Sequence, residues 1–391
     1  MRGVPVIAAT AGPIEALPAP VLPADLPWVE LITPSHLAVR GAPALVEVRG
    51  RAGRGPRAAL ELVVVIDLSA STLTASGMDV DADGVVGVAS TRSPRNAFGD
   101  LRPYRTWTTD SGDTVMAAEI LAAHRLLRRL DAATTRVGIV SFTGRPRIVA
   151  SIGSIEDAAA ALNGIRAALD TTGTNLGGAV RVAASMLQRS ERRGGGAARK
   201  AVLVLSDGSP TVPHPELFAR SFSVTAARWA ASRNIAVHGF AIGDPRDDHV
   251  LADMAAVSGG EFLQVRDVSD VVEYMPYTDL AGIELVSIHN RTAGVAGRAV
   301  RLFSDGSFDG LVPLVSGENL VEVRVRSRQG TEVFRLCTIT YDDAAAADAE
   351  RGAALYRELK LRTHETELAA RAKASRPAPR DVRRVEIRAE D

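Results

Sequence analysis

The stretch that decides the fold is "LELVVVIDLSAS", residues 60–71. It opens with a short, nearly continuous apolar run that is rich in β-branched side chains, which is typical of a strand buried on both faces of a parallel sheet. Asp67 ends this run, and Ser69 and Ser71 follow at alternate positions. Because alternate residues of an extended segment project to the same side, three side-chain oxygens can converge there. The stretch therefore predicts a buried strand whose C-terminal end carries an oxygen-rich loop.

An alternation of apolar strands and amphipathic helices extends from residue 60 to residue 275. The expected strands after the first are 136–143, 147–152, 201–207, 235–243 and 261–265, and the expected helices are 113–131, 154–169, 175–190, 215–232 and 248–258. This alternation predicts an α/β fold, a doubly wound and mostly parallel sheet with helices on both faces. Ligands of such folds bind at the C-terminal ends of the strands, which is where the loop after Asp67 lies.

The segments on either side of this unit read as short strands separated by turns, without helices. They are 28–33 and 44–50 before it, and 282–290, 298–303, 307–314, 319–327 and 331–340 after it. We expect residues 27–59 and 276–342 to form one all-β sandwich, so that the α/β domain (60–275) is an insertion within it. Residues 1–26 are expected to be a flexible N-terminal segment. Residues 343–391 form a helix-prone, charged tail, which is either a solvated surface helix or a docking helix.

Composition and charge exclude some classes of partner and location. The 46 Lys and Arg residues balance 46 Asp and Glu residues, so no overall field favours nucleic acid or an anionic membrane. No apolar run approaches the roughly 20 residues of a membrane span. The N-terminus contains Pro5 and only a brief apolar stretch, which makes it a poor secretion signal. Cys337 is the single cysteine, and its strand-like context predicts a buried thiol.

Two further polar residues are expected to join the loop after Asp67. Asp207 ends the apolar strand "AVLVLSD", and Thr174 lies in the glycine-containing loop "TTGTN" just before a helix. One or two carboxylates, several hydroxyls and room for water suit a hard cation of the size of Mg²⁺. The sequence therefore predicts a magnesium-type site at the C-terminal edge of the sheet.

The set D-x-S-x-S (Asp67, Ser69, Ser71), the Thr of "TGTN" (Thr174) and the Asp of "LSDG" (Asp207) resembles the metal-ion-dependent adhesion site, or MIDAS, of bacterial-type von Willebrand factor A domains. The resemblance covers residues 60 to 275 and follows the family's order. It implies that these five residues hold Mg²⁺ or Mn²⁺ and leave one coordination position open. An Asp or Glu of a protein partner would fill that position. The resemblance thus implies protein recognition without catalysis.

The sequence "GSFDGLVPLVSGENLVEVRVRS", residues 306–327, resembles bacterial immunoglobulin-like modules. Such modules occur mostly in envelope and secreted proteins, so this resemblance favours a periplasmic, cell-envelope or secreted location. The sequence leaves the location, the partner's identity and the oligomeric state open.

About 40 residues, the segment 72–112, separate the serines from the first helix, where the family runs almost directly into that helix. Within the segment, Asp79, Asp81 and Asp83 fall at positions 1, 3 and 5 of a loop similar to the calcium loops of EF-hand and dockerin repeats. Position 12, normally Glu, is Ser90, so further ligands must come from elsewhere, with Asp100, Asp110 and Asp113 as candidates. Two carboxylates about 4 Å apart repel by about 1 kcal/mol in water and ~4 kcal/mol at an effective dielectric constant of 20. We expect Ca²⁺ to order this segment; an extended, solvated loop is the alternative.

Three aromatic residues of the same segment are candidates for contact with a partner: Phe98, Tyr104 and Trp107. Packing of these rings onto their own domain is the alternative interpretation. Both interpretations place the segment at the rim of the predicted metal site.

Two other functions are alternatives to protein recognition. The chain lacks a nucleophile elbow, a dinucleotide-binding turn and a phosphate-binding loop, so a magnesium-dependent hydrolase using Asp207 would lack an evident general base. The second alternative is an intracellular subunit of an ATPase-coupled chelatase or assembly complex. The predicted sandwich argues against that alternative.

Overall fold

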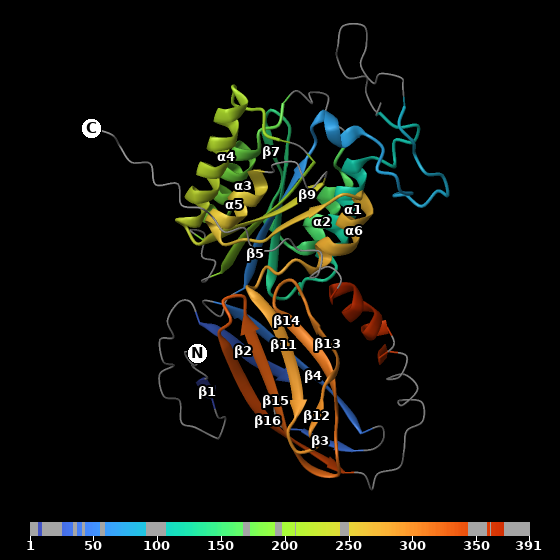
Figure 1. The fold of residues 1–391 in the computed structure, drawn as a ribbon, viewed down its shortest axis with the longest axis vertical. Helices are drawn as coiled ribbons and strands as arrows, with labels where there is room; N and C mark the ends of the chain where they lie inside the picture. The colour runs from blue at the N-terminus through green and yellow to red at the C-terminus, as the bar shows by residue number, and fades with distance from the viewer. Residues whose placement is uncertain are drawn as a thin grey trace, which may run out of the picture.

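The computed structural model describes residues 7–9, 26–33, 37–40, 44–54, 59–90, 107–166, 173–191, 198–207, 209–242, 250–342, 358–359 and 361–370. An α/β domain stands above a β-sandwich, with the N-terminal strands in the sandwich (Figure 1). The chain begins in the sandwich, crosses into the α/β domain and returns to the sandwich.

The sheet of the α/β domain has the strand order β10-β9-β8-β5-β6-β7. Its strands are β5 (Leu60–Asp67), β6 (Thr135–Phe142), β7 (Pro146–Gly153), β8 (Arg199–Ser206), β9 (Ile235–Ile242) and β10 (Phe262–Val265). All neighbouring pairs are parallel except β6 with β7, which is antiparallel. The doubly wound, mostly parallel sheet expected from the sequence is therefore confirmed.

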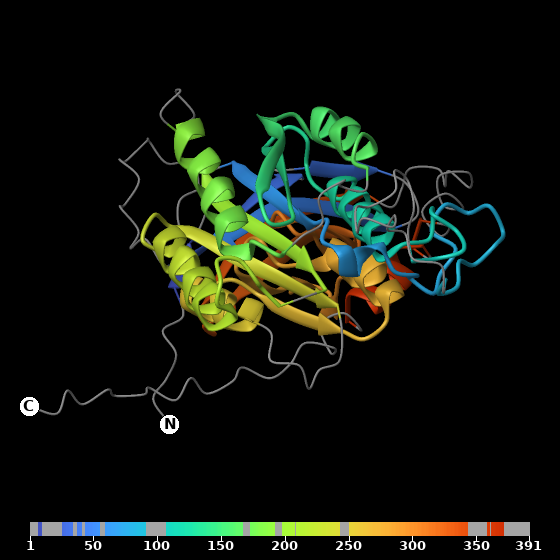
Figure 2. The ribbon, with the colours of Figure 1, turned by 90° about the horizontal axis from the view of Figure 1, so that it is seen from above.

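Helices cover both faces of this sheet (Figure 2). They are α1 (Val115–Leu127), α2 (Ile155–Asn163), α3 (Leu176–Glu191), α4 (Glu216–Ala231), α5 (Val250–Ser258) and α6 (Val268–Tyr274), with 3-10 turns η1 (Ala70–Leu73) and η2 (Met275–Tyr277). Alternate residues of β5 pack into two separate cores: Leu62 and Val64 against α1, α2 and α6, and Val63 and Val65 against α3, α4 and α5. Every residue of β5 is buried, which explains its unbroken apolar sequence.

Two helices differ from the sequence expectation. Helix α2 ends at Asn163, where Gly164 takes the C-cap position, although the pattern predicted a helix to residue 169. The pattern also gave no helix after β10, yet "VSDVVEY" forms α6. Its Val268, Val271 and Val272 are buried against the α1 side of the sheet. Valine has low helix propensity, so tertiary burial decides this segment.

The sandwich consists of two sheets. One has the order β1-β16-β15-β11-β12, with β3 also paired to β16, and the other has the order β13-β14-β4-β2. The strands are β1 (Ile7–Ala9), β2 (Pro27–Thr33), β3 (Leu37–Arg40), β4 (Leu45–Arg54), β11 (Ile283–Asn290), β12 (Val295–Ala296), β13 (Arg298–Leu302), β14 (Ser307–Pro313), β15 (Gly317–Ser327) and β16 (Glu332–Asp342). Their inner faces share one hydrophobic core that includes Phe308 and the free, buried Cys337. Segments before and after the α/β domain thus pair with each other, as in β4 with β14.

Residues 361–370 of the tail form a helix. Its Arg362 side chain is 3% exposed and forms ion pairs with Glu47 of β4, with Asp309 of β14 and with Glu358. Glu365 pairs with Arg301 of β13, so this helix is docked on the sandwich (Figure 1). Among the described residues, no helix is long and apolar enough to cross a membrane.

Candidate metal centre

The candidate centre lies at the C-terminal ends of the adjacent parallel strands β5 and β8. Asp67 is the last residue of β5 and is fully buried. One of its carboxylate oxygens accepts a hydrogen bond from the Ser69 backbone N–H at 2.8 Å, and the other accepts from the Ser206 hydroxyl at 2.6 Å. These bonds fix the Asp67 carboxylate where the chain turns into η1.

The predicted hydroxyls connect the two strand ends. The Ser69 and Ser71 Oγ atoms are 3.0 Å apart, and the Ser71 hydroxyl donates to Asp207 Oδ1 at 2.8 Å. Asp207 follows β8 directly. The structure therefore brings together four of the five residues predicted from sequence in one hydrogen-bonded group.

The fifth residue, Thr174, is buried in the loop before α3. Its backbone N–H donates to Thr211 Oγ1 at 2.9 Å, and its carbonyl accepts from the N–H groups of Thr211 (3.0 Å) and Val212 (3.3 Å). These bonds attach the Thr174 loop to the segment that follows Asp207. Gly173 has φ +78°, a left-handed conformation that favours glycine at this turn.

Glu119 is a member of this region that the sequence analysis missed. It lies in α1 and is fully buried. Neither carboxyl oxygen has a hydrogen-bond partner of good geometry among the residues described by the structure. Burial, followed by the charges of Asp67 and Asp207, raises the pKa of Glu119 well above its usual range; the nearby Asp67 N–H lowers it only slightly. A signal was present, because Glu119 stands at i+4 from Val115 and i−3 from Ala122 on the buried face of α1.

The electrostatics of the group favour a bound cation. Burial raises the pKa of Asp67, and burial together with the charge of Asp67 raises the pKa of Asp207 to about 7. Three carboxyl groups in a desolvated place disfavour ionisation of one another, and a divalent cation relieves that repulsion. Carboxylate and hydroxyl oxygens are ligands suited to Mg²⁺. The residues present therefore fit a divalent metal, which would polarise and bind an oxygen ligand from outside.

A second acidic group is formed by residues of the segment 72–112 together with Asp113, the residue that follows it. Ligand oxygens of Asp79, Asp81 and Asp113 lie within 4.8 Å of one another, and so do those of Asp81, Asp83 and Asp110. The three aspartates of the predicted calcium-type loop are thus joined by two of the further candidates. Asp100, the third candidate, lies outside the described residues.

The backbone of this loop is wound around its own carboxylates. Asp79 accepts hydrogen bonds from the N–H groups of Asp83 (3.1 Å) and Gly84 (3.0 Å), and Gly84 has φ +90°. Asp113 is fully buried and accepts from Val80 N–H at 2.6 Å and from Gly87 N–H at 2.7 Å. These bonds argue against the fully extended loop that the sequence left as an alternative.

Asp81 is the exposed member that both acidic groups share. Partial desolvation raises its pKa, and the carboxylates of Asp83, Asp110 and Asp113 raise it further. A Cβ added at Gly112 would collide with the Asp81 carboxylate. The glycine therefore allows the chain of residues 110–113 to approach the loop of residues 79–83.

The segment is also bound to its domain by backbone contacts. Trp107 N–H donates to Leu73 O at 2.8 Å, and Thr74 pairs with Trp107 in an isolated bridge. The Trp107 ring is half-buried against the core on the α1 side. Phe98 and Tyr104 lie outside the described residues, so contact of the three aromatics with a partner stays a prediction.

The structure therefore has an α/β domain with a candidate cation centre at the C-terminal edge of its sheet. Residues 112–275 match the family model of the von Willebrand factor type A domain, and this part of the chain is a VWA domain. VWA domains are in general metal-dependent protein-interaction modules. The match begins at residue 112, the last residue of the segment 72–112. Strand β5, with its Asp-x-Ser-x-Ser motif, precedes the matched residues and joins the same sheet between β6 and β8.

Several solved structures are similar to this chain at low sequence identity. An aerotolerance-related membrane protein from Bacteroides fragilis is 17% identical and covers 55% of this chain and 96% of its own, with a TM-score of 0.37. A von Willebrand factor type A protein from Catenulispora acidiphila is 14% identical and covers 82% of this chain and 75% of its own, with a TM-score of 0.39. The proximal thread matrix protein 1 of the mussel byssus, with a zinc-occupied MIDAS motif, is 14% identical over 59% of this chain and 49% of its own, with a TM-score of 0.41. No curated protein sequence matches the chain.

Proposed function

We propose that this chain is a non-enzymatic protein-binding module of the adhesion or assembly type, in which a MIDAS metal coordinates an acidic side chain of a partner. The observation that carries the proposal is the group of the buried Asp67 and Glu119 and the half-buried Asp207 beside the hydroxyls of Ser69 and Ser71. Mg²⁺ or Mn²⁺ is the proposed ion, held by Asp67, Ser69, Ser71, Thr174 and Asp207. The hydroxyl ligands add no negative charge of their own, so the ion can accept a partner's Asp or Glu at the coordination position that stays open.

The partner can be tested without knowing its identity. A random-peptide display library is selected on immobilised protein with Mg²⁺ and is eluted with EDTA. We expect the eluted peptides to share an Asp or Glu and to lose binding to the Asp207→Asn variant. The Asp253→Asn variant, changed at an exposed position on α5, serves as the matched control. Eluted peptides without a common acid, or equal binding to both variants, would overturn the proposal.

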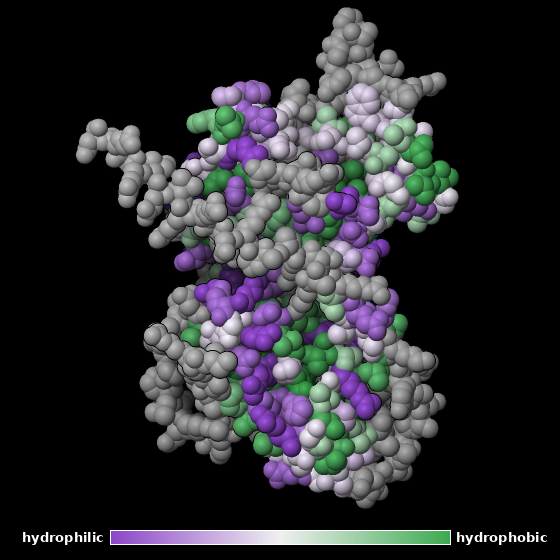
Figure 3. Space-filling model, in the orientation of Figure 1, coloured by the Kyte–Doolittle hydropathy of each residue, from purple (hydrophilic) through white to green (hydrophobic). Residues whose placement is uncertain are grey.

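We propose a second ion, Ca²⁺, in the acidic group of Asp79, Asp81, Asp83, Asp110 and Asp113. Two overlapping groups of carboxylate oxygens within 4.8 Å of one another support it. This ion would order the rim of the metal centre, where the segment presents exposed Val85, Val86 and Val88. Figure 3 shows hydrophobic surface at the outer edge of the α/β domain on this side.

Titration calorimetry separates the two ions. We expect Ca²⁺ binding to be lost in Asp81→Asn and kept in Asp207→Asn, and Mg²⁺ binding to show the opposite pattern. Loss of both ions in either single variant would contradict two independent sites.

Finally, we propose a cell-envelope or secreted location, in keeping with the β-sandwich that carries the VWA domain. Fractionation of the native host, with the chain found only in the cytoplasmic fraction, would contradict it.

A further inference from the structure

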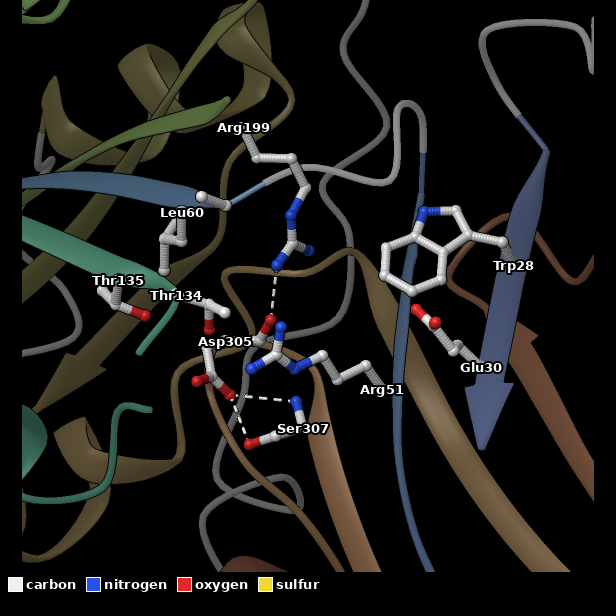
Figure 4. A pocket seen from close by; sticks show the side chains of 10 residues that line it. Trp28, Glu30, Arg51, Leu60, Thr134, Thr135, Arg199, Asp305 and Ser307 are labelled. Carbon is white, nitrogen blue, oxygen red and sulfur yellow. Dashed lines mark hydrogen bonds between the residues drawn. The ribbon is translucent and has the colours of Figure 1, made fainter. Parts of the chain in front are cut away.

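A cavity of about 140 Å³ lies between the two domains, at the end of the α/β sheet opposite to the metal centre. Leu60, Thr135 and Arg199 stand at the N-terminal ends of β5, β6 and β8 and line one side of it. Trp28 and Arg51, from β2 and β4 of the sandwich, line the other side (Figure 4). This cavity has no part in the proposed metal-dependent binding.

Arg199 brings uncompensated hydrogen-bond donors to this cavity. Its Nη2 donates to the backbone oxygen of Asp305 (Figure 4). Its Nε and Nη1 atoms are buried, and neither has a hydrogen-bond partner within the part of the chain that the structure describes. The hydroxyl of Thr135, which also lines the cavity, is buried and has no partner among the same residues. Buried polar atoms in native proteins almost always have a partner, so these atoms indicate a ligand.

The neighbouring carboxylates do not supply that partner. Asp305 Oδ1 already accepts from the N–H and the hydroxyl of Ser307, and its Oδ2 accepts from the Asp131 N–H. Arg51 donates to Asp131 rather than sharing a carboxylate with Arg199. Burial lowers the pKa of Arg199, and the charges of Asp305 and Asp279 only partly oppose this. The guanidinium therefore keeps a charge that protein groups leave incompletely paired.

The size and the wall charges of the cavity select the ligand class. Its volume of about 140 Å³ has room for a small ion such as acetate. Water can accept hydrogen bonds from the Arg199 nitrogens, but it brings no charge to pair with the buried guanidinium. An anionic oxygen accepts the hydrogen bonds and also supplies the negative charge. Glu30 and Asp305 also line the cavity and repel a dianion about twice as strongly as a monoanion.

We propose that this cavity binds a small monocarboxylate anion, with Arg199 as its charged donor. The anion contacts both domains and so ties the base of the VWA domain to the sandwich. Arg199 also begins β8, the strand that ends next to Asp207. The junction and the metal centre therefore lie at opposite ends of one buried strand.

The test uses the full chain at pH 7 with sodium acetate, sodium formate, sodium phosphate and sodium chloride at matched ionic strength. Calorimetry and thermal unfolding are measured for the wild type, for Arg199→Met and for the matched control Arg298→Met, which changes an exposed arginine outside the cavity. We expect acetate or formate to bind saturably, with a Kd on the order of millimolar, and to raise the Tm of wild type and control alike. Arg199→Met should bind at least about tenfold more weakly, a difference of ~1.4 kcal/mol.

Three results would overturn the proposal. The first is equal binding of acetate by Arg199→Met and by the wild type. The second is the absence of saturable binding of both acetate and formate, which would mean that water fills the cavity. The third is binding of phosphate without binding of either carboxylate. If Arg199→Met does not fold, crystals of the wild type soaked in bromoacetate decide the question. A bromine anomalous peak within the cavity supports the proposal, and its absence there refutes it.

Discussion

Asp207 offers the sharpest test of the metal centre, because its ionisation costs stability when no metal is bound. Burial, and then the charge of Asp67, raises the pKa of Asp207 from 3.8 to about 7 in the folded chain. The folded state therefore holds a proton between about pH 4 and pH 7 that the unfolded state has released. By linkage, the metal-free protein loses stability as the pH rises through this window.

The size of the effect follows from the shift. A difference of about 3 pKa units, at 1.36 kcal/mol per unit, gives at most about 4 kcal/mol lost between pH 4 and pH 8. Asp207→Asn replaces the carboxyl by a neutral group of the same shape, whose amide oxygen can still accept from the Ser71 hydroxyl. In EDTA we thus expect this variant to match the wild type near pH 4 and to exceed it by up to about 4 kcal/mol at pH 8.

The assay is urea unfolding in EDTA at pH 4, 5, 6, 7 and 8, and again with excess Mg²⁺. Asp253→Asn is the control and should follow the wild type at every pH. With Mg²⁺ the order at pH 8 should reverse, because the ion stabilises only the chain that binds it. The contrary result is that the free energy of unfolding of Asp207→Asn in EDTA differs from that of the wild type by the same amount at every pH. In that case the Asp207 carboxyl is not desolvated beside other carboxyl groups, and the electrostatic argument for a bound cation fails.

Three other changes test separate parts of the structure. Asp81→Asn should make the segment 72–112 equally sensitive to protease with and without Ca²⁺, whereas Ca²⁺ should protect it in the wild type; protection that persists in the variant would contradict a role for this carboxylate. Gly50→Ala places a Cβ against the Phe308 ring on the neighbouring strand of the same sheet and should destabilise the sandwich by about 1–3 kcal/mol, measured by urea unfolding. An unchanged midpoint would mean that the Phe308 ring and the neighbouring strands yield easily. Arg362→Met removes the ion-pair partner that Glu47 and Asp309 share. It should therefore lower the free energy of unfolding by about 1–3 kcal/mol and expose the tail helix to protease. A tail that stays protected would show that other contacts dock it.

Much of the fold followed from local patterns. The all-buried β5 and the alternation of strands and helices predicted the parallel sheet, because burial on both faces requires a continuous apolar strand. Helix α6 was missed for the converse reason: its valines favour strands, and only packing against the α1 side of the sheet makes them helical.

The sequence by itself determined where Asp67, Ser69, Ser71 and Asp207 would lie, because the ends of adjacent parallel strands meet at one edge of a sheet. Only the tertiary structure decided which residues from elsewhere join them. Glu119 reaches the metal centre because α1 packs its apolar face onto β5, and Arg199 becomes a buried, partly unpaired charge because two domains close over it. Both depend on desolvation by contacts between segments far apart in the chain, and no local pattern encodes how completely water is excluded from them.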